Sequence, residues 1–223
     1  MCGRFVQNYT WREVNDLYDL VGAARNLQAH YNIAPTDTVE VVRCGEGGAT
    51  ELVPMRWGLV PWWWKKPLKQ LPASFNARAE SVADKPMFRD AFKRHRCIIP
   101  AGGYYEWEKR PDGKQPYFIS AADGGVLSFA GLWDRWKNPE TGEHLTSCTI
   151  IITGANAHTR PIHDRMPVIL DKADIGSWLG GAGGTELLRS AADDKLRLWP
   201  VSRRVNKTGT GDDDPTLIDE VAA

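Results

Sequence analysis

The run Cys148-Thr149-Ile150-Ile151-Ile152-Thr153 decides the fold class. Three consecutive isoleucines between threonines favour a β-strand, because β-branched side chains pack well on a pleated sheet. Similar short runs, bounded by glycine, proline or aspartate, occur at residues 38–42, 52–57, 97–99, 117–120, 126–130 and 168–170. Since these strands do not alternate with helices, the sequence predicts an α+β fold with a mainly antiparallel, curved or barrel-like β core.

A few helices are expected to flank this core. Thr10-Trp11-Arg12-Glu13 matches a capping box, and the apolar residues that follow it have helical spacing. Asp84-Lys85-Pro86 precedes a second segment with helical spacing, with proline near its first turn and basic residues at its end. Both helices are therefore predicted from their boundary signals.

The chain reads as one domain, residues 1–205, followed by an acidic tail, residues 206–223. It has 223 residues, of which 42% are hydrophobic and 25% charged, and it shows no internal repeat. The tail carries one lysine against five acidic residues and contains the glycine-rich run Thr208-Gly209-Thr210-Gly211. This composition predicts that the tail is flexible.

Several classes of protein are excluded by composition. No run approaches the about 18 apolar residues of a membrane span, and no apolar signal region follows Met1, so a cytoplasmic protein is expected. The cysteines, at positions 2, 44, 97 and 148, form no Cys-x-x-Cys pair, which argues against a zinc ribbon or a disulfide framework. His158 and His163 lack the spacing of a helical metal site, so we expect neither a metal nor a cofactor.

Charge is distributed unevenly along the chain. Residues 56–110 contain twelve lysines and arginines against five acidic residues, a net charge of +7, with aromatic residues interleaved. Single-stranded nucleic acid is bound by this combination, since cations meet phosphates and rings stack on bases. A solvated basic surface is the alternative.

Cys2 is the first candidate for chemistry. Small residues at position 2 generally permit removal of the initiator methionine, which would leave Cys2 with a free α-amine beside its thiol. The two groups have ordinary pKa values of about 7.7–8.0 and about 8.5, so each is partly nucleophilic near neutral pH. Such a residue can attack an acyl group, or it can close a thiazolidine ring on an aldehyde. A chance cysteine at the chain start is the alternative.

Three further segments carry candidate side chains. Asn76 and Arg78 lie two residues apart, on one face if that segment is extended. Glu106 follows a glycine-rich turn among aromatic residues, where burial would raise its pKa into the range of a general acid or base. His163 lies in a loop bounded by prolines. Structural roles remain open for each: a turn cap, a surface ion pair and a solvated histidine.

The run Trp62-Trp63-Trp64 is the last candidate. Alternate side chains of an extended strand point to opposite faces, so three adjacent tryptophans cannot all belong to one core. At least one of them is expected to be exposed.

Together these segments resemble the SRAP family, the SOS-response-associated peptidases or abasic-site processing proteins. The resemblance covers most of the chain through six ordered motifs: Met1-Cys2-Gly3-Arg4-Phe5, Tyr31-Asn32-Ile33-Ala34-Pro35, Arg56-Trp57-Gly58-Leu59-Val60-Pro61, Asn76-Ala77-Arg78-Ala79-Glu80, Gly103-Tyr104-Tyr105-Glu106-Trp107 and His163-Asp164-Arg165-Met166-Pro167. It implies that the chain captures abasic sites in single-stranded DNA through a thiazolidine link to the N-terminal cysteine, as part of DNA repair.

Residue roles follow from the matched motifs. The resemblance implies that Cys2 is the nucleophile, Asn76 its positioner, Glu106 the proton-transfer group and His163 the helper in ring opening and reversal. It also implies DNA contacts by a second set of residues, Arg4, Trp63, Trp64, Arg78 and Arg165. A small residue is common in the family at position 62, so Trp62 leaves open which two tryptophans stack. The resemblance also implies that the partner is single-stranded DNA with an abasic site. No protein partner is predicted, and we expect a monomer that is nucleoid-associated when bound to DNA.

The chemistry of an abasic sugar agrees with these roles. Its open form is an aldehyde, and both ring opening and loss of water from a carbinolamine need a proton shuttle, for which Glu106 and a neutral His163 are suited. A Schiff-base intermediate also permits β-elimination, which predicts weak lyase activity.

Other readings remain open. An N-terminal-nucleophile amidohydrolase would also begin with Met-Cys-Gly, but the Asn-Gly dipeptide expected of the amidotransferases of that class is absent from this sequence. A peptidase that cleaves after Met1 or acts on another protein is a second alternative, and a single-strand binder without catalysis is a third.

Overall fold

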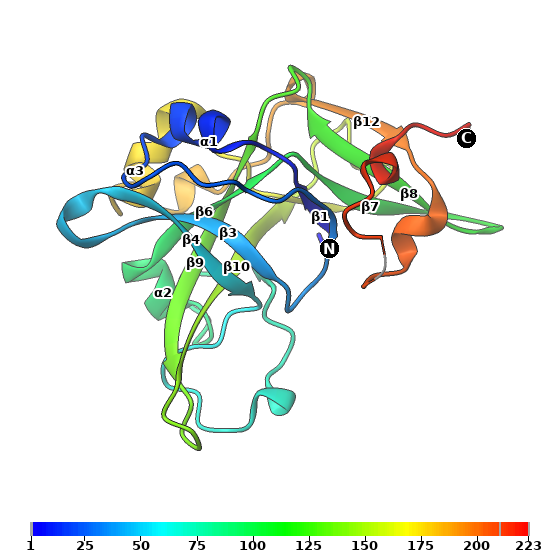
Figure 1. Cartoon of the computed structure of the whole chain (residues 1–223). Coiled ribbons are helices and arrows are strands. Elements are labelled where there is room, and N and C mark those ends of the chain that lie inside the picture. Colours follow the sequence, from blue (N-terminus) through cyan, green and yellow to red (C-terminus); the bar gives the residue numbers. More distant parts are fainter. Residues whose placement is uncertain (1, 210, 223) are drawn as a thin grey trace.

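The computed structural model describes residues 2–209 and 211–222. Within these ranges the chain forms three α-helices: α1 (Trp11–Tyr18), α2 (Arg89–Arg94) and α3 (Ile175–Leu179). It also forms the strands β1 (Phe5–Gln7), β2 (His30–Ile33), β3 (Thr38–Cys44), β4 (Thr50–Trp57), β5 (Asn76–Arg78), β6 (Arg96–Ala101), β7 (Gly103–Arg110), β8 (Gly113–Ala121), β9 (Leu127–Lys137), β10 (His144–Gly154), β11 (Arg165–Pro167) and β12 (Leu196–Pro200). The helices lie on one side of the molecule, and β7, β8 and β12 lie on the opposite side (Figure 1).

Five strands close into a small barrel. The antiparallel pairs β4–β3, β3–β6, β6–β9 and β9–β10 follow one another, and a short parallel pairing of β10 with β4, Cys148 opposite Trp57, completes the ring. β5 and β11 extend the sheet along β10. The predicted α+β fold with a mainly antiparallel, barrel-like core is therefore confirmed.

A second sheet stands beside the barrel. Its five strands are all antiparallel, in the order β12-β8-β7-β1-β2. β1 lies between β7 and β2, so the start of the chain is held inside a sheet.

The isoleucine run is strand-forming because both faces of β10 are buried. Ile150 and Ile152 pack in one core with Phe5, whereas Ile151 packs in another core with Trp178 of α3. A strand covered on both sides reads as a continuous apolar run rather than an alternating one.

Local signals predicted the elements unevenly. Thr10 forms the predicted capping box with Glu13 at the start of α1. The second helix begins at Arg89 and is preceded by a turn, in which the Lys85 carbonyl accepts hydrogen bonds from the amides of Phe88 and Arg89. Residues 168–170 form no continuous strand; a single bridge joins Phe129 to Ile169.

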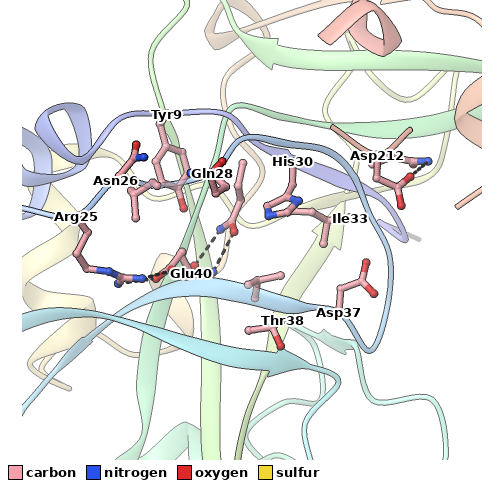
Figure 2. Close-up of a pocket in the computed structure, with 14 residues that line it drawn as sticks. Tyr9, Arg25, Asn26, Gln28, His30, Ile33, Asp37, Thr38, Glu40 and Asp212 are labelled. Atoms are coloured by element: carbon pink, nitrogen blue, oxygen red, sulfur yellow. Dashed lines mark hydrogen bonds and ion pairs between the residues drawn. The ribbon is translucent and has the colours of Figure 1, made fainter. Parts of the chain in front are cut away.

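The Gln7 side chain connects the barrel to the second sheet. Its Oε1 accepts a hydrogen bond from the Glu40 amide at 3.0 Å, and its Nε2 donates to the carbonyl oxygens of Glu40 and Pro100, both at 2.9 Å. Gln7 thereby satisfies backbone groups of β3 as a neighbouring strand would. Beside it lies a polar crevice in which Arg25 pairs with Glu40 at 2.5 Å (Figure 2).

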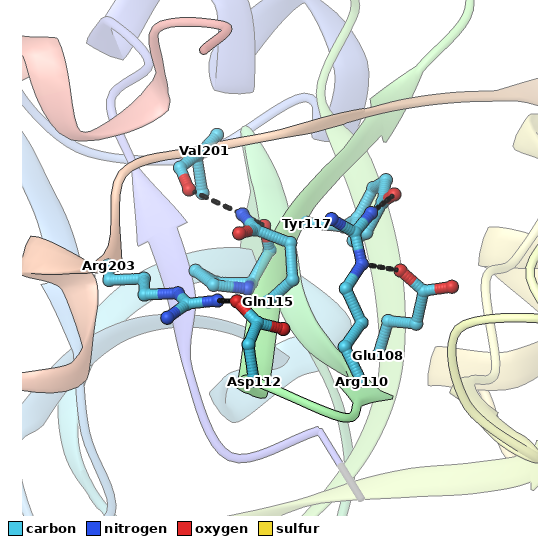
Figure 3. A network of polar contacts seen from close by, with 8 residues as sticks. Glu108, Arg110, Asp112, Gln115, Tyr117, Val201 and Arg203 are labelled. Atoms are coloured by element: carbon cyan, nitrogen blue, oxygen red, sulfur yellow. Dashed lines mark hydrogen bonds and ion pairs between the residues drawn. The ribbon is translucent and has the colours of Figure 1, made fainter. Parts of the chain in front are cut away.

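The C-terminal segment packs against the second sheet. Near the β7–β8 turn, Gln115 donates to the Val201 carbonyl at 2.9 Å, and Arg203 pairs with Asp112 at 2.5 Å (Figure 3). Further along, Trp199 donates to the carbonyl of Ile218 at 2.7 Å. The described part of the acidic tail thus makes defined contacts, and its flexibility stays a prediction.

Among the described residues, no helix has the length and apolar character needed to cross a membrane.

Candidate active site

The start of the chain is fixed by an asparagine from the barrel. Asn76 opens β5, which pairs in parallel with β10, and its Nδ2 donates a hydrogen bond to the Cys2 carbonyl oxygen at 2.7 Å. The other amide atom, Oδ1, is buried and accepts no hydrogen bond from any residue that the structure describes. Asn76 therefore holds the Cys2 backbone and has one acceptor to spare.

The Cys2 thiol is fully buried in the chain that carries Met1. Burial, and after it the nearby charge of Glu106, raise the pKa of the thiol well above its ordinary value. Its Sγ lies 3.9 Å from the Arg4 carbonyl oxygen, which can accept a weak hydrogen bond from a neutral thiol. The resting sulfur is thus a thiol and not a thiolate.

Glu106 approaches the same region from β7. Its side chain is only 2% exposed, and burial raises the pKa of its carboxyl group from 4.5 to about 7. At neutral pH this carboxyl group divides between its acidic and basic forms, which suits it to proton transfer in either direction.

Close packing of β7 on β8 positions Glu106. A Cβ atom on Gly103 would lie 2.6 Å from the Ile119 carbonyl oxygen, so a larger residue would push the strands apart. Tyr104 lies on the same face of β7 as Glu106, and burial, followed by the charges of Cys2 and Glu106, raises the pKa of its phenol. Gly103 is therefore needed for packing and is the first residue of β7, while Gly102 lies at a bend between β6 and β7.

His163 lies in the loop before β11. Its Nδ1 accepts a hydrogen bond from the Arg165 amide at 3.0 Å, and burial lowers the pKa of the imidazole while Asp164, 3.1 Å from Nδ1, opposes that shift. An accepting Nδ1 places the proton of the neutral ring on Nε2.

Glu106 and His163 meet in one open pocket. The pocket has a volume of about 470 Å³ and is lined by Glu106, His163, Trp107, Asn206, Lys109 and Lys114. Its two lysines make the entrance attractive to an anion. The four predicted catalytic residues are therefore linked. Asn76 holds the Cys2 backbone, and the charge of Glu106 acts on the Cys2 thiol. Glu106 and His163 line the same pocket.

The three predicted DNA-contacting arginines differ in their surroundings. Arg78 is exposed and lies two residues after Asn76, on the same face of β5. Arg165 pairs with Glu80 at 2.5 Å. Arg4 is half-buried and donates to the Val205 carbonyl at 2.8 Å, so part of its guanidinium group serves the fold.

The tryptophan run departs from the predicted geometry. Trp62, Trp63 and Trp64 do not form an extended strand but lie in a turn, closed by a hydrogen bond from the Trp64 amide to the Pro61 carbonyl at 2.9 Å. One tryptophan is exposed, as expected, and it is Trp62, at 57%. The rings of Trp63 and Trp64, both half-buried, lie 6.2 Å apart.

Two residues at the site were missed in the sequence. Tyr104 could have been found from its spacing, because a residue two positions before Glu106 on a strand shares its face. Asn32 is almost fully buried, accepts from Arg4 at 3.2 Å and donates to the Lys207 carbonyl at 2.7 Å. No local pattern predicts these long-range partners.

These features define an α+β protein in which a barrel and a second sheet enclose a cysteine at position 2. The chain belongs to the SRAP family: the model of the SOS response associated peptidases matches residues 1–208. This confirms the resemblance found in the motifs.

Relatives from distant organisms align with most of the chain. The abasic site processing protein YoqW of Bacillus subtilis is 35% identical over 214 residues, covering 92% of this chain and 94% of that protein. YedK of Escherichia coli, also named an abasic site processing protein, is 30% identical over 92% of this chain and 94% of its own length. HMCES of Gallus gallus, named likewise, is 35% identical over 70% of this chain, a match that covers 54% of the longer protein.

The fold is shared with a solved protein. A crystal structure of a protein from Bacteroides thetaiotaomicron superposes with a TM-score of 0.87, at 25% identity, over 99% of this chain and all of the other.

Proposed function

We propose that this protein, after removal of Met1, captures abasic sites in single-stranded DNA as a thiazolidine at Cys2. One observation carries the proposal: Asn76 fixes the Cys2 backbone, and Cys2 lies within the electrostatic reach of a buried carboxyl group whose pKa is about 7. The relatives named abasic site processing proteins support the same substrate.

In the first stage, the Cys2 α-amine adds to the aldehyde carbon of the open sugar and forms a carbinolamine. Loss of water from this intermediate gives a Schiff base, and the departing oxygen needs a proton. Glu106 supplies that proton in its acidic form, since it is partly protonated at neutral pH.

In the second stage, the Cys2 sulfur adds to the same carbon and closes a five-membered ring. The ring nitrogen keeps the hydrogen of the protonated Schiff base and the thiol proton passes to Glu106, so the net reaction joins aldehyde and aminothiol with release of one water molecule. Glu106, left as carboxylate by the first stage, accepts the thiol proton that the high pKa of Cys2 would otherwise retain.

Asn76 and His163 have supporting roles. The spare Oδ1 of Asn76 can accept a hydrogen bond from the α-amine or from a sugar hydroxyl group. His163, neutral and protonated on Nε2, faces the pocket that it shares with Glu106 and aids ring opening and reversal of the adduct.

Phosphates and bases would be bound around this centre. Arg4, Arg78 and Arg165 contact phosphates, and Trp63 and Trp64 stack on bases near the lesion. The Schiff base allows a weak lyase side reaction, and peptidase activity would be limited to self-processing.

Mass spectrometry tests the proposal. The purified protein is incubated with an oligonucleotide carrying one abasic site, and we expect a species equal to the sum of both masses less one water. An oligonucleotide with a tetrahydrofuran analogue, which has no aldehyde, is the matched control. A Cys2→Ala variant should lose the heat-stable adduct, and a chain with a leucine inserted before Cys2 should lose it as well. Amide or peptide cleavage without any adduct would overturn the proposal in favour of a hydrolase that does not act on DNA.

A further inference from the structure

The loop that carries the tryptophans begins and ends at the candidate active site. It leaves the barrel after β4 and returns at β5, whose first residue is Asn76. Its stem is joined by a hydrogen bond from the Leu59 amide to the Ser74 carbonyl at 3.2 Å. In Figure 1 this cyan loop projects below the barrel.

Two side chains of β9 hold the tryptophan turn in place. Asp134 Oδ2 accepts a hydrogen bond from the Trp62 amide at 2.9 Å, and the Trp136 indole donates to the Trp64 carbonyl at 2.7 Å. Asp134 is only 3% exposed, and its other oxygen accepts from the Arg135 amide at 2.8 Å. The turn backbone is therefore anchored on both sides of Trp63.

Of the three indole rings of this anchored turn, that of Trp62 is the most exposed to solvent. Trp62 is 57% exposed, in contrast to Trp63 and Trp64. Residues 58–79 contain three lysines and one arginine and no acidic residue, and Lys65 and Lys66 are exposed directly after the turn. A rigid ring beside fixed positive charge suits a polyanion with flat bases better than a neutral or basic protein surface.

We propose that Trp62 is an additional base-stacking residue, which extends the single-strand binding surface beyond Trp63 and Trp64 to one more nucleotide. Asp134 is its positioning residue, because it holds the Trp62 backbone from the buried side of the loop. This inference rests on the proposed function, since it concerns the same DNA strand. Pre-ordering by β9 lowers the entropy lost when a base stacks on the ring.

The test uses undamaged single strands of increasing length and four variants: Trp62→Phe, Trp62→Leu, Trp62→Ala and Asp134→Asn. Stacking on a base is worth about 1–3 kcal/mol, so Trp62→Ala should weaken binding of long strands about fivefold or more and leave the shortest strands unaffected. Trp62→Phe should keep most of the affinity, whereas Trp62→Leu should behave like Trp62→Ala.

A double-mutant cycle separates positioning from a general structural effect. Asp134→Asn should weaken binding in the wild-type background and have no further effect in Trp62→Ala. Equal loss in both backgrounds would remove Asp134 from the proposal.

The remaining outcomes are also decisive. Wild-type affinity in Trp62→Ala at every length would overturn the stacking role, and equal affinity of the leucine and phenylalanine variants would indicate a general apolar contact instead. Length-dependent loss in a protein that forms no adduct would support Trp62 and contradict the proposed chemistry alone. Adduct formation together with unchanged strand affinity in Trp62→Ala would support the proposed chemistry and contradict the role of Trp62.

Discussion

Asn76 Nδ2 donates a hydrogen bond to the Cys2 carbonyl oxygen across 2.7 Å, and this contact ties the start of the chain to the barrel. Because β5 is itself paired with β10, this hydrogen bond fixes the Cys2 backbone relative to the barrel.

Replacing Asn76 should slow the reaction more than it affects the fold. A hydrogen bond of this kind contributes about 0.5–1.5 kcal/mol, so Asn76→Ala should lower the single-turnover rate of adduct formation by roughly fivefold, with the unfolding midpoint little changed. Asn26→Ala, an exposed asparagine of the polar crevice, is the matched control and should react like wild type. Equal rates for both variants would exclude a positioning role for Asn76.

Glu106 should make stability fall as pH rises. Its folded pKa of about 7 lies above the ordinary 4.5, so the folded state keeps a proton that the unfolded state loses between these values. The carboxyl group therefore favours the folded state fully below pH 4.5, and this contribution of about 3 kcal/mol disappears as pH rises to about 7.

Urea unfolding of Glu106→Gln measures this contribution. The variant should lack the decline over that range and should be the more stable protein above it. Glu140→Gln, on an exposed hairpin, removes the same charge and should follow the wild-type profile. A parallel decline in both variants would mean that another group is responsible.

His163 should act in its neutral form down to acidic pH. Burial lowers the pKa of the imidazole, and Asp164 partly opposes this, so Asp164→Asn should lower it further. If neutral His163 aids adduct reversal, the reversal rate should decrease only when the pH drops below the ordinary pKa range of histidine. In Asp164→Asn this decrease should occur at lower pH. His163→Ala should be slow at every pH; reversal as fast as in wild type would remove the residue from the mechanism.

Glu80 should compete with DNA for Arg165. The two side chains pair at 2.5 Å, and a phosphate must replace this carboxylate before Arg165 can contact it. Glu80→Gln should therefore tighten single-strand binding, while Arg78→Ala should reduce the slope of log affinity against log salt by about 0.7. Fluorescence anisotropy at several salt concentrations measures both effects. Unchanged affinity in Glu80→Gln would show that Arg165 takes no part in binding.

The sequence predicted what depends on neighbouring residues. The β-branched run before residue 154 predicted β10, and the capping box predicted the start of α1, because each signal lies within one element. The aromatic neighbours of Glu106 also predicted that burial raises the pKa of its carboxyl group, and the folded chain buries this side chain in that way.

Features made by distant segments could not be predicted in this way. The ring closes through two residue pairs of β10 and β4, which no local pattern marks. The tryptophan turn is fixed by Asp134 from 72 positions away, and without that contact the run reads as a strand. The contact between Asn76 and Cys2 likewise joins residues 74 positions apart, which meet only in the folded molecule.

Gln7 lies at the boundary between the barrel and the second sheet, and opening of this boundary can be observed. Because one side chain, rather than a strand, protects the Glu40 amide, hydrogen exchange at that amide should report separation of the two sheets without unfolding of either. β1 lies along this boundary and begins three residues after Cys2. The same local opening would therefore loosen the packing around Cys2, and exchange at Glu40 would follow how often the buried Cys2 side chain becomes accessible to solvent.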